Sequence, residues 1–134
     1  IKPGGCFMTT HFAEGSMAPM QQLILQRLRA YGVCVLEASW SCLHNEELNR
    51  QLYDSAGFSA IRHGRSQVGY RFKDASEWWD VVWWAGYRGF VNQVPADKVA
   101  LFKQEHLDEV NALADDDGIY FNVEVIHTLG EKLA

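Results

Sequence analysis

The sequence is poor in cysteine, in proline and in long hydrophobic runs. Its 134 residues include three cysteines and three prolines. An odd number of cysteines at unrelated spacings forms no disulfide scaffold, and a chain of this length needs none, so we expect a reducing, cytoplasmic setting. No apolar run approaches the ~18 residues of a membrane-spanning helix, so we expect no membrane partner.

An excess of basic residues is also missing. Lys and Arg total 12 against 17 Asp and Glu, which gives a formal net charge of −5. This balance disfavours a general electrostatic attraction to nucleic acid. Apolar residues make up 48% of the chain, which is enough to build a core in a protein of this size. The length predicts a single domain over residues 1–134.

What the sequence does contain is an ordered series of strand and helix signals. Runs of β-branched and aromatic residues predict strands over residues 6–12, 59–72 and 119–128. Capping residues and apolar residues at helical spacing predict helices that begin at Ser16, Asn45, Asp74 and Pro95. Residues 33–40 fit either a short strand or a packed loop. Together these signals predict an α/β fold with about four helices.

Aromatic residues are concentrated in the third predicted helix. They step by four, four and three positions, which predicts one aromatic stripe made of Trp79, Trp83, Tyr87 and Phe90. A stripe of this kind is usually part of a hydrophobic core. The alternative is that it forms the apolar wall of a ligand pocket.

Histidine and cysteine residues supply the other candidates for chemistry. His11 lies at the end of the first predicted strand, where ligands of open α/β sheets bind. Its imidazole is a candidate general base, and the alternative is a hydrogen-bonded or solvent-facing loop histidine. Cys34, Cys42 and His44 have the composition of a metal cluster, but their spacing shows no paired ligands. We therefore expect no metal.

A series of landmarks recurs in a characteristic order along the whole chain. They are Lys2-Pro3-Gly4-Gly5 before the first predicted strand, Ala56-Gly57-Phe58 before the second, the Glu77-Trp78-Trp79 helix, and the run from Gly118-Ile119 to Gly130-Glu131-Lys132. This order resembles the C-terminal half of class I S-adenosylmethionine (SAM)-dependent methyltransferases, in the type 11 branch that is similar to the ubiquinone-biosynthesis enzymes. The resemblance implies a partial Rossmann-like fold.

The resemblance also implies a strand order. The family's sheet ends in the order five, seven, six, with the seventh strand antiparallel between its neighbours. Carried over to this chain, residues 6–12 form one edge, residues 119–128 the middle and residues 59–72 the other edge of a three-stranded mixed sheet.

The part of the family that holds SAM has no counterpart in this sequence. The family uses a glycine-rich loop after its first strand and an acidic residue that ends its second. The eleven glycines here include no Gly-x-Gly-x-x-Gly. We therefore expect a substrate-side portion that binds no SAM and transfers no methyl group alone. The alternative is a stand-alone, non-enzymatic dimer that binds a small hydrophobic or aromatic ligand.

Two further expectations depend on the resemblance. The family's segment between strands six and seven commonly covers the substrate pocket, which implies a substrate-binding role for Trp79, Trp83, Tyr87 and Phe90.

The family's fifth strand pairs with a fourth, which lies in the missing half, so the strand Cys6–Phe12 is expected to have an open edge. We expect a homodimer through this strand, or a swap of the N-terminal segment. Pairing with a separately encoded N-terminal half is the alternative.

Overall fold

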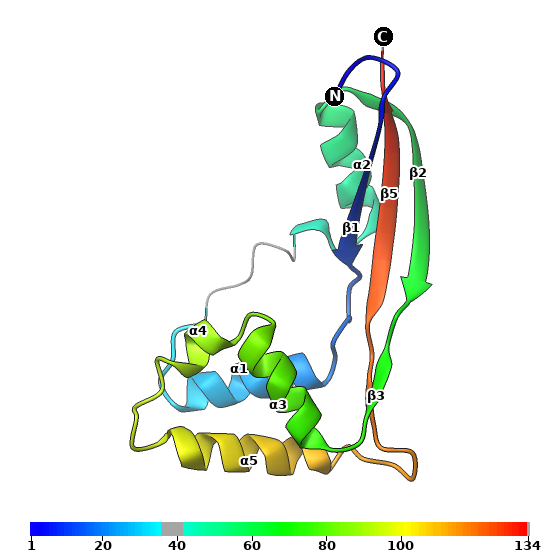
Figure 1. The fold of residues 1–134 in the computed structure, drawn as a ribbon. Coiled ribbons are helices and arrows are strands. Elements are labelled where there is room, and N and C mark those ends of the chain that lie inside the picture. The colour runs from blue at the N-terminus through cyan, green and yellow to red at the C-terminus, as the bar shows by residue number, and fades with distance from the viewer. Residues whose placement is uncertain (36–41, 134) are drawn as a thin grey trace. The chain divides into compact units, whose positions relative to one another are not determined.

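The structure, a computed structural model, describes residues 1–35 and 42–133 (Figure 1). The chain divides into two compact units. The first contains the described residues of 1–16, 37–68 and 122–134, and the second those of 17–36 and 69–121. The predicted strand or loop at residues 33–40 lies largely outside the described residues, and 33–35 belong to no regular element.

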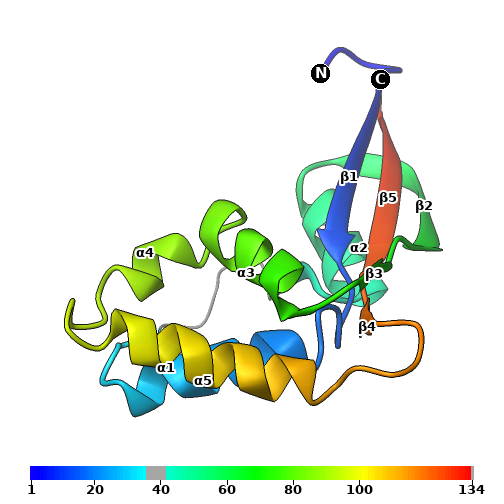
Figure 2. The same cartoon turned by 60° about the horizontal axis from the view of Figure 1, so that its bottom comes forward.

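The first unit contains a three-stranded sheet. Its strands are β1 (Cys6–Phe12), β2 (Phe58–Gln67) and β5 (Glu124–Lys132), in the order β1-β5-β2 (Figures 1 and 2). The predicted order, with the last strand in the middle, is confirmed. Both pairings are antiparallel, so β1 and β2 point the same way and the sheet is not mixed. A mixed sheet would need a further parallel neighbour at one of its edges.

One face of this sheet packs against α2 (Glu46–Ser55). The buried Tyr53 hydroxyl donates to the Thr128 carbonyl at 2.9 Å and lies 2.9 Å from Thr9 Oγ1. Its ring lies over Gly130, where a Cβ would stand 2.6 Å from Tyr53 Cδ1. A glycine at position 130 is therefore what lets the helix approach the sheet.

The start of α2 agrees with the predicted cap, because the Asn45 side chain accepts a hydrogen bond from the Leu48 amide at 2.9 Å. We expect Asn45→Ala to lower the free energy of unfolding by about 1 kcal/mol, since that amide loses its acceptor. Asn45→Asp keeps an acceptor and is expected to stay near the parent value. Urea denaturation measures both, and equal losses in the two variants would contradict the capping role.

The second unit contains helices α1 (Met20–Ala30), α3 (Ala75–Trp84), α4 (Arg88–Val91) and α5 (Val99–Asn111). A two-stranded sheet of β3 (Tyr70–Phe72) and β4 (Ile119–Phe121) completes it. Helices α1 and α3 both pack against α5 (Figure 2). The core between these elements includes Met20, Ile24, Leu28, Trp78, Val82, Phe102 and Ile119.

The predicted boundaries differ from the structure in three places. Residues 59–72 and 119–128 each form two strands, because β3 and β4 pair with each other in a separate sheet. Helix α1 begins at Met20 and not after Ser16, because Met17 has a φ of 67° and the Ser16 hydroxyl accepts from the Glu124 amide. A turn from Pro95 to Lys98 precedes α5, which starts at Val99.

The α/β class is confirmed, with five helices among the described residues. The short α4 is the one beyond the four predicted. None of the helices in the described part of the chain has the length and hydropathy needed to cross a bilayer.

Candidate functional site

The aromatic stripe predicted for one helix is divided between two. Helix α3 ends at Trp84, and Gly86 follows with a φ of 118°. Trp79 and Trp83 therefore belong to α3, whereas Tyr87 caps α4 and Phe90 lies within it. The backbone turns at Gly86 because a helix cannot continue through a residue with positive φ.

The two tryptophans of the stripe differ in burial. Trp79 is 8% exposed and meets Phe102 edge to face, with the ring centroids 6.3 Å apart. Lys103 Nζ lies 5.0 Å from the Trp79 ring centroid. Trp83 is half-buried, and the Arg88 guanidinium carbon lies 4.7 Å from its ring centroid. Both contacts have the geometry of cation–π interactions, which orient the indole rings.

Tyr87 and Phe90 complete the predicted set. The Tyr87 hydroxyl accepts a hydrogen bond from Gln21 Nε2 at 3.1 Å, and its ring lies 6.1 Å from that of Trp78. Burial raises the pKa of Tyr87, so the phenol stays neutral. Phe90 is half-buried against the core. Trp83 and Phe90 therefore keep surface that a ligand can contact, while Trp79 and Tyr87 belong mainly to the core. The substrate-binding role of the stripe stays a prediction.

A hydrogen-bonded pair of a tryptophan and a histidine is buried in the second unit. Trp78 Nε1 donates to His106 Nε2 at 2.8 Å, and both side chains are fully buried. Burial lowers the pKa of His106 from 6.5 to about 4, so the imidazole is neutral at pH 7. Because Nε2 accepts, the neutral ring carries its proton on Nδ1, which lies 3.8 Å from Glu109 Oε2.

Charged groups extend this pair towards α1. Arg27 forms ion pairs with both Glu105 and Glu109. The Tyr31 hydroxyl donates to Glu105 Oε2 at 2.7 Å, and this bond raises the pKa of Tyr31. The sequence signal for this network is a matched spacing. Arg27 on α1 and Tyr31 at its C-terminal cap lie four apart, as Glu105 and Glu109 do on α5. These ion pairs and this hydrogen bond join α1 to α5, so their role is structural.

A cavity of about 330 Å³ lies on the same helices. Its lining residues are Ala30, Tyr31, Lys98 and Leu101. The tyrosine and the leucine supply apolar surface, and the lysine supplies a positive charge. The sequence patterns pointed to none of these residues as a ligand site.

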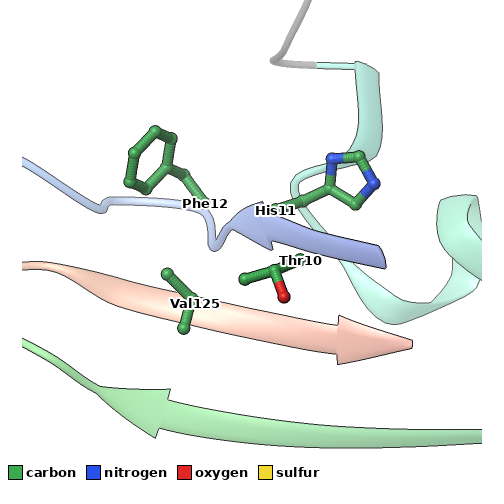
Figure 3. Close-up of a pocket in the computed structure, with 4 residues that line it drawn as sticks. All are labelled: Thr10, His11, Phe12 and Val125. Atoms are coloured by element: carbon green, nitrogen blue, oxygen red, sulfur yellow. The ribbon is translucent and has the colours of Figure 1, made fainter. Parts of the chain in front are cut away.

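His11 lies at a cavity in the first unit. This cavity has a volume of about 220 Å³ and is lined by Thr10, His11, Phe12 and Val125 (Figure 3). Figure 3 shows the His11 ring and the Thr10 hydroxyl on opposite sides of β1. His11 Nε2 is buried without a hydrogen-bond partner among the described residues. No hydrogen bond to a described residue therefore occupies this nitrogen, and the general-base role stays a prediction.

The other side of the same strand carries a row of polar contacts. Thr10 Oγ1 lies 3.2 Å from His127 Nδ1, and His127 Nε2 lies 3.0 Å from Ser66 Oγ. The row crosses all three strands of the sheet. Thr10 and His127 are directly opposite in the register, so the row reflects cross-strand pairing.

The cysteines show no metal-binding arrangement. Cys6, Cys34 and Cys42 are free and exposed. Within residues 1–35 and 42–133, no group of three or more His, Cys, Asp or Glu side chains is arranged to hold a metal ion.

Comparison with known proteins assigns no family. No family model matches the chain, and no curated protein matches its sequence. The fold by itself defines an α/β protein with a three-stranded and a two-stranded sheet.

Proposed function

We propose that the chain is the substrate-side portion of a class I SAM-dependent methyltransferase-like protein, which neither binds SAM nor transfers a methyl group alone. The observation that carries this proposal is the strand order β1-β5-β2, with the last strand antiparallel to both neighbours. The resemblance to the methyltransferases implies that order for strands five, seven and six.

This order is informative because it departs from the simplest arrangement of three successive strands. Strands that follow one another in a chain are neighbours in about two-thirds of cases. Here β1 and β2 do not pair, and β5 inserts between them. A simple antiparallel meander would instead place β2 in the middle. The insertion therefore supports the proposed relationship more strongly than composition or helix content does.

The described residues do not fit SAM itself. The sequence contains no Gly-x-Gly-x-x-Gly, the glycine-rich loop that precedes a cofactor-binding helix in that family. We therefore derive no step through the cofactor. In this proposal the second unit contributes the half-exposed aromatic surface of Trp83 and Phe90 for contact with a methyl acceptor.

A comparison of two chains tests the proposal. We expect SAM to leave the melting temperature of the 134-residue chain unchanged. The same residues, expressed with an upstream in-frame segment that encodes a glycine-rich loop, are expected to gain about 3 kcal/mol at a hundredfold excess of SAM over its Kd. Thermal shift and calorimetric titration measure both effects, with ATP as the control adenosine ligand. Binding of SAM by the 134-residue chain would contradict the proposal.

A second candidate is a stand-alone dimer that binds a small hydrophobic ligand. The observation that favours it is the exposed apolar surface of β1, where Phe7 and Phe12 are 42% and Met8 is 60% exposed. Homodimerisation through β1 would pair its open backbone edge and place a strand of the second copy beside these side chains. This candidate requires a stable dimer of the 134-residue chain and no response to SAM, so solution mass and SAM titration distinguish the two.

A further inference from the structure

Strand β1 lacks the features that usually protect an edge strand. No other strand pairs with its outer edge among the described residues. Its seven residues, CFMTTHF, include no Lys, Arg, Asp, Glu or Pro, and its register against β5 is unbroken. The opposite edge strand, β2, carries Arg62 and Arg65 and has a bulge between Ser59 and Arg62. Charges and bulges discourage pairing at a sheet edge. Of the two edge strands, β1 is therefore the one that can accept a further strand.

The hydrogen bonds at both ends of β1 define which backbone groups are free. The Lys132 amide donates to the Gly5 carbonyl at 2.8 Å, and the Ala13 amide donates to the Glu124 carbonyl at 2.9 Å. Bonded and non-bonded pairs alternate along an antiparallel ladder, so odd-numbered residues bond to β5. The N–H and C=O groups of the even-numbered residues therefore point to the open edge; these are Cys6, Met8, Thr10 and Phe12.

We propose that β1 pairs antiparallel with β1 of a second copy, with the two-fold axis at Thr9. This proposal rests on the homodimer proposed above and specifies its register. Centring on Thr9 sets Cys6 opposite Phe12 and Met8 opposite Thr10. Each outward N–H of one copy then faces an outward C=O of the other. If the register between the two strands shifted by one residue, residues whose N–H and C=O point outward would face residues whose groups point towards β5. Larger shifts would leave some outward N–H and C=O groups without a partner.

Symmetry and charge favour the same arrangement. A two-fold axis along the strands would make them parallel and would set each N–H against the identical N–H of the other copy. Lys2 precedes β1 and Glu14 follows it. In the antiparallel arrangement the start of one β1 lies beside the end of the other, so these unlike charges of the two copies become neighbours. The parallel one would bring like charges together.

The proposed register adds residues of the second copy to a cavity described above. Thr10 and Phe12 line the 220 Å³ cavity with Val125. Met8 of the partner subunit stands opposite Thr10, and Cys6 of the partner subunit stands opposite Phe12. The dimer thereby gives each cavity a second apolar wall. A small apolar ligand with one hydrogen-bonding group, which Thr10 can meet, suits this composition.

Cysteine cross-linking of the 134-residue chain tests the register. In Phe12→Cys, the new thiol lies opposite the native Cys6 of the partner subunit, at the Cα separation of about 5.5 Å that a disulfide accepts. We expect mild oxidation to give a covalent dimer on a non-reducing gel. Cys6→Ser in the Phe12→Cys background is expected to abolish it, and His11→Cys is expected to give none. A dimer that does not cross-link through these positions overturns the register.

A second variant tests the edge without relying on a disulfide. Met8→Pro removes an outward N–H and leaves the β1–β5 hydrogen bonds intact, so we expect about a tenfold or greater rise in the dimer Kd, with Met8→Leu as the matched control. Sedimentation velocity at micromolar concentration measures both, and circular dichroism checks folding. A monomeric parent chain, or equal Kd values for the two variants, overturns the interface. Neither result touches the methyltransferase proposal, which SAM binding by the extended chain tests separately.

Discussion

Replacing Trp78 with alanine is expected to lower the free energy of unfolding of the protein by about 3–5 kcal/mol. The indole is fully buried and contacts the rings of Tyr87, His106 and Phe121. Its removal leaves a large hole in the core, and it also leaves His106 Nε2 buried without its donor. Chemical denaturation followed by the circular dichroism of the helices measures the loss.

The chain offers a matched control for this substitution. Trp84 lies on the same helix and is 74% exposed, so Trp84→Ala is expected to change the stability by no more than about 0.5 kcal/mol. Trp78→Phe separates the two causes, because it keeps most of the ring volume and removes the hydrogen bond. Similar losses for Trp78→Ala and Trp84→Ala would show that the core is not organised around Trp78.

Acid is expected to lower the free energy of unfolding of the protein through His106. The folded-state pKa of this histidine is about 4, below its ordinary value of 6.5, because burial disfavours the charged imidazolium. Its contribution to stability is therefore complete above pH 6.5, falls as the pH drops from 6.5 to 4, and is lost below 4. A shift of this size corresponds to about 3 kcal/mol. Protonation of His106 Nε2 also converts this acceptor into an N–H donor that faces the Trp78 N–H, so the hydrogen bond between the two side chains is lost.

A variant that cannot titrate isolates this effect from the carboxylates. His106→Gln supplies an amide oxygen that can accept from Trp78 and stays neutral at every pH. We expect its unfolding free energy to decline less than that of the parent between pH 6.5 and 4. The measurement is urea denaturation at a series of pH values for both chains. Parallel pH profiles would contradict the assignment to His106.

The candidate sites show where sequence patterns succeed and where they fail. The spacing of Phe102, His106 and Val110 places them on one buried side of α5, and this follows from helical periodicity alone. The same periodicity extended the aromatic stripe through Gly86 to Phe90, because spacing does not reveal that this glycine adopts a positive φ. The cavity beside His11 was not predictable, since it arises from Val125 on a strand more than a hundred residues away.

By itself, the sequence determined the α/β class and the cap of α2 at Asn45. The position of the last strand between the other two was implied by the family resemblance, and the structure has that order. The class and the cap depend on local hydrogen bonds and on patterns that run along the chain. Only the tertiary structure decided that the long strand signals each divide in two, that α1 begins at Met20, and that Trp78 and His106 share a buried hydrogen bond. Each of these depends on contacts between distant residues, whose free energies exceed the local preferences that a sequence pattern expresses.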